Sequence, residues 1–216
     1  MGYQTIFRRY EFKYLLKREE KERLLDQISC LLQSDLYPQS TVRNIYFNTE
    51  NDLLIRRSME KPIYKEKLRI RSYRKASCDS TVFVELKKKY RHVVYKRRVS
   101  LAEKDAREWL CGSGRRENPT QIEKEIDYFL NFYSSLKPSL FLSYDRVAFA
   151  DSGESDLRIT FDENILFRRK HHGSRPHAGR HGNPGLRQNG NHHRREPFWV
   201  RARWAWRKAS VMPRKG

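Results

Sequence analysis

Two neighbouring stretches of the sequence decide the fold, KEKLRIRSY at residues 65–73 and TVFVELKKKY at residues 81–90. In each stretch, apolar and charged side chains alternate with a period of two, which is typical of a β-strand with two different faces. The intervening Ser77-Cys78-Asp79 is typical of a turn. The pair therefore predicts an antiparallel hairpin with one apolar face and one strongly charged face.

The same alternation recurs along the first 169 residues. It predicts strands at about 8–15, 42–48, 64–74, 81–90, 92–99, 139–149 and 156–162. Apolar residues at helical spacing predict helices at 17–33, 52–59, 101–111 and 120–135. Thr120 and Glu123 have the spacing of a capping box at the start of the last helix. Consecutive strands with interspersed helices predict an α+β fold built on an antiparallel sheet.

The charged strand faces admit two interpretations. Strand by strand, a solvated face of a sheet is the simpler one. However, at least five strands repeat the pattern, and the helices need an apolar sheet face to pack on. If the apolar faces turn outward to the helices, the charged faces line the interior of a barrel, where arginine and lysine would repel one another without a bound anion. The acids Glu11, Glu85 and Asp162 would lie among these cations, an arrangement that suits a divalent metal beside phosphate.

The composition also points to an anionic partner. The chain has 216 residues, 46 Lys and Arg against 26 Asp and Glu, and a formal net charge of +20. Nucleic acid, an acidic membrane surface, inositol phosphates and polyphosphate all fit this charge. No apolar run approaches the ~20 residues of a membrane span, and the three cysteines form no CxxC pair. These features predict a cytoplasmic protein without a membrane span, a disulfide framework or a cysteine zinc site.

The sequence changes character after residue 169. Residues 170–216 hold 12 Lys and Arg but one acid, Glu196, and six of the seven histidines. This predicts two parts, a domain at 1–169 and a disordered basic tail at 170–216. The tail could be an arm that binds nucleic acid non-specifically, or its histidine pairs could bind metal. A third interpretation, a shifted reading frame, fits the abrupt change after Phe167 best.

Six segments resemble the VTC domain, the polyphosphate polymerase module of the vacuolar transporter chaperone family. They are Arg9–Tyr14, Asn44–Thr49, Lys67–Tyr73, Val84–Lys87, Ser143–Arg146 and Leu157–Asp162. The VTC domain is one of the triphosphate tunnel metalloenzymes, a superfamily that includes the CYTH group. The resemblance implies an antiparallel β-barrel with helices outside, enclosing a basic tunnel. It also implies that ATP binds in the tunnel and that the γ-phosphoryl group passes to polyphosphate with Mn²⁺ or Mg²⁺.

The resemblance also implies which residues do this. Lys13, Arg69, Arg71, Lys87, Arg146 and Arg158 match the positions that grip phosphate, and Glu11 and Glu85 match the acidic, metal-binding positions. Lys96 and Arg98 are additional ligand-binding candidates because they share a strand face. Arginine suits this task because its planar guanidinium group binds phosphate oxygens in pairs.

The chain departs from the family pattern after residue 162. The family continues into a strand with a metal-binding glutamate between hydrophobic residues and then into a Ser-Lys-Tyr segment, and neither occurs here. This predicts a barrel that is incomplete at its C-terminal end and a weak or absent polymerase activity. Two alternatives remain, a tunnel enzyme that cleaves triphosphate and a non-catalytic binder of polyphosphate or nucleic acid.

Overall fold

The protein is described by a computed structural model, which covers residues 6–60, 62–91, 93–112, 114, 116–151, 157–169 and 198–205. Its elements follow the predicted alternation of strands and helices. In chain order they are β1 (Ile6–Leu16), α1 (Arg18–Ile28), β2 (Leu32–Asn48), α2 (Leu53–Met59), β3 (Tyr64–Ser72), β4 (Thr81–Tyr90), β5 (Val93–Ala102), α3 (Glu103–Cys111), α4 (Gln121–Phe132), β6 (Lys137–Asp151), β7 (Arg158–Arg169) and β8 (Phe198–Ala205).

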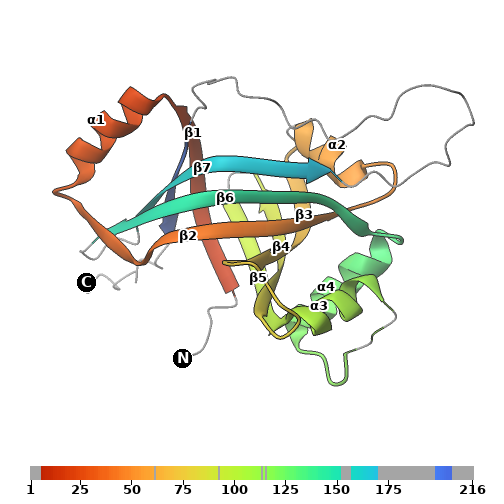
Figure 1. Ribbon diagram of the computed structural model, residues 1–216. Helices are drawn as coiled ribbons and strands as arrows, with labels where there is room; N and C mark the ends of the chain where they lie inside the picture. The colour runs from red at the N-terminus through yellow and green to blue at the C-terminus, as the bar shows by residue number, and fades with distance from the viewer. Residues whose placement is uncertain are drawn as a thin grey trace, which may run out of the picture.

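The strands form a closed barrel in the order β1-β5-β4-β3-β2-β6-β7-β8 (Figure 1). Every neighbouring pair is antiparallel. Figure 1 shows the helices outside the strands, with α3 and α4 side by side. The predicted class, an α+β fold with an antiparallel barrel and external helices, is confirmed.

Closure of the barrel depends on β8, which lies within the segment predicted as a tail. β8 aligns eight residues with β1 and five with β7. Without it, β1 and β7 would both be open edges, so the part of the barrel within residues 1–169 is incomplete, as the sequence indicates. The sequence predicts no strand at 198–205, and β8 corrects that expectation. The histidine pairs of the tail lie outside the described residues.

Several element boundaries also differ from the predicted ones. Helix α1 ends at Ile28 rather than 33, because Leu32 is a buried residue of β2 instead of the last apolar residue of a helix. Helix α3 begins at Glu103, with Ala102 as its N-cap, because β5 continues through Ala102. The predicted capping box of α4 is present, since Thr120 accepts from the Glu123 backbone and the Glu123 side chain accepts in return. Each helix in the described part of the chain is too short or too polar to cross a membrane.

The hydrophobic core lies outside the barrel wall, between β3 and β4 and the helices. Leu68, Val82, Val84 and Leu86 are at most 1% exposed and pack in one cluster with helix residues. The helix residues of the cluster include Leu54 of α2, Ala106, Trp109 and Leu110 of α3, and Ile126 and Phe129 of α4. Because side chains alternate along a strand, the neighbours of these apolar residues point into the barrel.

Candidate functional site in the barrel interior

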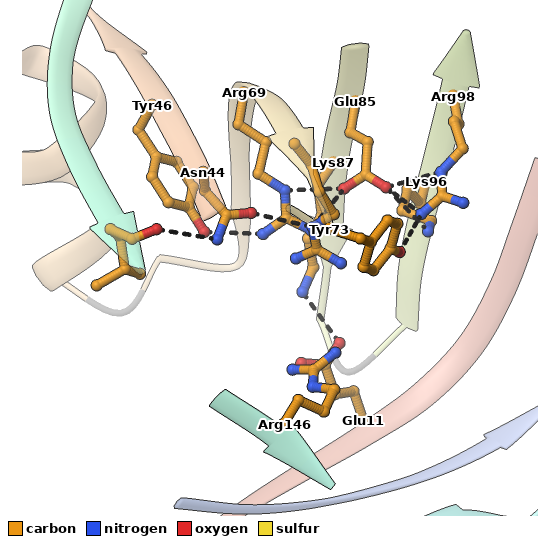
Figure 2. A network of polar contacts seen from close by, with 12 residues as sticks. Glu11, Asn44, Tyr46, Arg69, Tyr73, Glu85, Lys87, Lys96, Arg98 and Arg146 are labelled. Carbon is orange, nitrogen blue, oxygen red and sulfur yellow. Dashed lines mark hydrogen bonds and ion pairs between the residues drawn. The ribbon is translucent and has the colours of Figure 1, made fainter. Parts of the chain in front are cut away.

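A fully buried carboxylate, Glu85 of β4, lies between two arginines on the inner face of the barrel. Arg69 of β3 and Arg98 of β5 are its direct cross-strand neighbours. The Arg69 Nε donates to Glu85 Oε2 at 2.8 Å, and the Arg98 Nε donates to Oε1 at 2.8 Å (Figure 2). We call these three residues the arginine rung. Each oxygen of Glu85 is thus taken by one guanidinium group.

A second set of cations lies beside the arginine rung on β3 and β6, and the Nε of Arg71 is 3.8 Å from Glu85 Oε2. The Arg71 Nε donates to Asn44 Oδ1 of β2 at 3.0 Å, and Arg146 of β6 forms two hydrogen bonds to Asp162 of β7 at 2.6 and 2.7 Å. The hydroxyl of Tyr144 lies between the two arginines, 3.2 Å from Arg71 Nη2 and 3.3 Å from Arg146 Nη2. One continuous chain of polar contacts therefore joins β2, β3, β6 and β7.

The lysines complete the interior. Lys87 of β4 donates to Glu11 of β1 at 3.0 Å, and Lys13 lies 3.7 Å from the same carboxylate. Lys96 of β5 donates to Glu85 Oε1 at 3.3 Å. Figure 2 shows Lys87 extending toward Glu11 while Glu85 stays with the arginines. The two acids therefore serve as separate counter-ions.

The cations control the ionisation of Glu85. Burial alone would raise the pKa of its carboxyl group, but four neighbouring cations outweigh burial and hold that pKa well below its usual range. They are Arg69, Arg71, Lys96 and Arg98. Glu85 is therefore ionised throughout the physiological range.

The positive charge of the arginines also lowers the pKa of Tyr144. Burial alone would raise the pKa of the Tyr144 phenol. Arg71, Arg146 and, more weakly, Arg69 outweigh burial and lower this pKa to about 8. The ordinary value for tyrosine is 10.0. A neutral phenol between two guanidinium groups is thus close to becoming a further anion of the interior, beside the carboxylates of Glu11, Glu85 and Asp162.

Most of the predicted site residues meet in this interior. Contacts join one group around Glu85, which consists of Arg69, Arg71, Lys96, Arg98 and, through Tyr144, Arg146. Lys87 pairs with Glu11 in a second group, with Lys13 half exposed at its edge. Arg158 is not among them, because it forms an ion pair with Asp35 of β2 at 2.5 Å. The prediction did not single out Asn44 or Tyr144, which are neutral partners of the arginines. Their position on inward faces of predicted strands was the one available signal.

The acids do not form a metal site. Both oxygens of Glu85 accept from guanidinium groups, and Glu11 is paired with lysines. Among the described residues, no three His, Cys, Asp or Glu side chains lie close enough together to hold a metal ion. The residues present therefore do not fit the Mn²⁺ or Mg²⁺ that the resemblance implies. A cavity of about 680 Å³ lies outside the barrel beside Arg57, Phe132 and Tyr133, and none of the predicted site residues lines it.

A barrel with helices outside and buried cations inside defines a tunnel-type domain that binds nucleotides or phosphate chains. The VTC domain family matches residues 8–205, and the chain belongs to that family. A search of curated proteins found no match. The matched range includes β8, so the family pattern extends beyond residue 169.

One solved structure supports the fold. A Bacillus halodurans protein, provisionally assigned as an adenylate cyclase, has a TM-score of 0.52 at 16% identity, covering 93% of this chain and 82% of its own. A protein from Pyrococcus horikoshii has a TM-score of 0.40 at 11% identity, covering 93% and 80%. At 16% identity the first comparison shows the fold alone.

Proposed function

We propose that the barrel binds the phosphate chain of ATP in its interior and transfers the terminal phosphoryl group to inorganic polyphosphate. One observation carries the proposal. The contacts inside the barrel join six cations to three carboxylates, and most of these groups are buried. The cations are Arg69, Arg71, Lys87, Lys96, Arg98 and Arg146, and the carboxylates are Glu11, Glu85 and Asp162.

This excess of positive charge calls for an anionic ligand. Water screens buried charges poorly, so uncompensated cations in the interior repel one another more strongly than on the surface. A phosphate chain would supply the missing negative charge and would accept hydrogen bonds from several guanidinium groups at once. Arg71 and Arg146 are the best placed to do so, because Tyr144 holds both side chains on one side of the interior.

The proposed reaction needs positioning and charge stabilisation more than a protein nucleophile. An oxygen of the terminal phosphate of polyphosphate attacks the γ-phosphorus of ATP. The bond from that phosphorus to the β,γ-bridging oxygen breaks, and ADP leaves with the electron pair. Polyphosphate becomes one unit longer. Arginines that already lie around the phosphate chain would stabilise the charge that spreads over the transferred group.

A second candidate function is non-catalytic binding of polyphosphate, and the acids of the interior favour it. Glu85 and Glu11 are both neutralised by cations, and no metal-binding group of side chains exists among the described residues. A binder needs only the cations, whereas phosphoryl transfer in this fold is expected to use a divalent metal. Triphosphate cleavage, the remaining alternative, would share the metal requirement.

One experiment separates the three functions. The full chain is incubated with ATP and Mn²⁺, and the products are separated on a gel that resolves polyphosphate chains, with phosphate release measured in parallel. Chain growth that is lost in Arg71→Ala supports the transferase. Release of phosphate without chains supports a triphosphatase. Salt-sensitive binding of polyphosphate without turnover supports the binder, and absence of any binding refutes all three.

A further inference from the structure

Exposed apolar side chains gather at one end of the barrel, where β3 begins and β4 and β7 end. Met59, the last residue of α2, and Ile63, just before β3, are 75% and 67% exposed. Leu166 and Phe167 of β7 are 68% and 75% exposed. Single exposed apolar residues are normal on a protein surface, whereas a group of them marks a place of interaction.

Contacts between the elements bring these residues to one surface. The Arg91 backbone donates to the Ile63 oxygen at 2.7 Å, which joins the end of β4 to the start of β3. Arg169 of β7 and Met59 of α2 line one cavity of about 450 Å³. Figure 1 shows the end of β7 beside α2. We call this surface the docking end and define it by residues 53–59, 63–64, 88–91 and 164–169.

The docking end is strongly basic as well as apolar. Its segments contain no Asp or Glu, but they contain Arg56, Arg57, Lys88, Lys89, Arg91, Arg168 and Arg169. Most of these cations adjoin an apolar residue: Arg91 lies over the ring of Tyr90 at 5.5 Å, and Arg168 follows Phe167. Glu60, directly after α2, is the neighbouring acid in the sequence. The surface therefore presents apolar groups inside a field of positive charge.

We propose that the docking end binds the surface of a lipid membrane that carries acidic headgroups. The aliphatic and aromatic side chains enter the boundary between headgroups and acyl chains, and the Lys and Arg side chains extend to the lipid phosphates and carboxylates. Each Lys or Arg near such a surface strengthens binding by about fivefold. The inference goes beyond the proposed function and is independent of it, because the docking end shares no residue with the ion pairs of the barrel interior.

The kinds of apolar residue favour lipid over nucleic acid. Single-stranded nucleic acid is bound by cations together with aromatic rings that stack on bases. Met59, Ile63 and Leu166 have no ring, so their exposure adds nothing to such binding, whereas each gains from contact with acyl chains. Tyr64 and Tyr90 lie directly opposite each other and are about half exposed. Tyrosine suits the headgroup layer because its ring is apolar and its hydroxyl is polar.

The charge of the docking end favours a membrane over a protein partner. The centre of a protein–protein interface is depleted in charged residues, and lysine in particular is rare there. Here the exposed Arg56, Arg91 and Arg168 lie among the apolar residues rather than around them. Cations interspersed with apolar groups match a surface that is negative throughout and apolar beneath.

The test measures binding of the full chain to vesicles by sedimentation. One set of vesicles is pure phosphatidylcholine, and the other contains equal parts of phosphatidylcholine and phosphatidylserine. The variant Met59→Ser/Ile63→Ser removes two apolar side chains of the docking end, and Arg56→Gln/Arg168→Gln removes two of its charges. Thermal melting checks that each variant is folded.

Each variant has a matched control elsewhere on the molecule. Leu31→Ser/Leu36→Ser changes two exposed leucines at the start of β2, whose other end leads to α2. Arg107→Gln/Lys124→Gln removes two exposed charges from α3 and α4. The remaining positive charge of the chain is the same in variant and control, so the difference between them reports on the docking end.

We expect the wild type to bind the acidic vesicles and not the neutral ones. The apolar variant should bind the acidic vesicles about tenfold more weakly, and the charge variant roughly thirtyfold more weakly, while both controls resemble the wild type. No binding by the wild type, or equal losses in variant and control, would overturn the proposal. A loss in the charge variant with none in the apolar variant would reduce the contact to adsorption by charge and would overturn it too. Absence of vesicle binding together with self-association that Met59→Ser/Ile63→Ser abolishes would assign the surface to a second copy of the chain instead.

Discussion

The two faces of β4 show how one strand can serve both stability and binding. Its outward residues Val82, Val84 and Leu86 are buried against three helices, where the wall gains its hydrophobic stabilisation. Its inward residues Glu85 and Lys87 are held by ion pairs. Ordinary sheets place the apolar face inside and the polar face in water. In this barrel the polar face is enclosed, so its stability depends on the balance of charge, which a ligand can change.

Removing Glu85, the central counter-ion of the inner face, should cause the largest loss of stability. In Glu85→Ala, the two guanidinium groups of the arginine rung and Lys96 would remain buried without their shared partner. Loss of one partner of a buried ion pair costs about 3–5 kcal/mol. We expect urea denaturation to show a loss of this size, and added tripolyphosphate to restore part of it because it supplies negative charge.

Glu125→Ala is the matched control, since Glu125 pairs with Arg97 on the outside at 3.2 Å and the pair is partly exposed. That change should cost less than about 1 kcal/mol. If Glu85→Ala were as stable as the wild type, the arginine rung would not need an anion.

The outer face should respond to truncation but not to anions. Leu86 is fully buried in the external core, so Leu86→Ala should cost roughly 2–4 kcal/mol through lost burial and a residual cavity. Tripolyphosphate should raise the melting temperature of this variant by as much as it raises that of the wild type. A larger rise in the variant than in the wild type would mean that the two faces of the wall are not independent.

The sequence predicted the parts of the fold in which alternation is strong. The pattern at 65–73 and 81–90 was sufficient to predict β3, β4 and their charged inner face. It failed for the first half of β2, where the segment 32–41 contains Pro38 and the pairing with β6 shifts register between Ser34 and Gln39. It also failed for β8, where Val200, Ala202 and Trp204 alternate with Arg201 and Arg203 over a few residues only, after a long segment without apolar periodicity. Such strands are set by the neighbours that they pair with, which local sequence does not specify.

The same limit applies to the site. Charged residues on inward faces could be predicted, and Arg69, Arg71, Lys87 and Arg146 meet as their pattern indicates. Which residue neutralises which depends on cross-strand register, so the role of Tyr144 between two arginines could not be read from the sequence. The ion pair of Arg158 could not be predicted for the same reason, because its partner Asp35 lies in the irregular part of β2.

Tyr144 should make the inner face sensitive to pH. Its pKa of about 8 in the folded protein lies below its ordinary value of 10, so ionisation stabilises the folded state. The contribution is present above pH 10, grows between about pH 8 and 10, and is lost as pH falls through 8. It amounts to at most roughly 2–3 kcal/mol.

Tyr144→Phe should therefore lose stability relative to the wild type as pH rises from 8 to 10, as measured by urea denaturation at each pH. The tyrosinate would also compete with phosphate for Arg71 and Arg146. Tripolyphosphate binding by the wild type should consequently weaken above pH 8 more than binding by Tyr144→Phe. Parallel pH profiles of the two proteins would contradict a titration of Tyr144 in this range.

The smallest effect should have the opposite sign. Lys67 faces Lys87 directly and has no ion pair with any described acid, so Lys67→Gln removes a repulsion of about 0.2–1 kcal/mol and should stabilise the protein without ligand. Lys88→Gln, on the outer face of the same hairpin, should produce no such gain. With saturating long-chain polyphosphate the advantage of Lys67→Gln should disappear, because the anion neutralises the same repulsion in the wild type. If removal of the Lys67 side chain stabilises the empty barrel but not the occupied one, that side chain serves binding and not stability. This result would distinguish the inner face of the wall from the outer face by their effects on the free energy of unfolding. Destabilisation by Lys67→Gln in the absence of anion would show instead that the lysine contributes to packing of the wall.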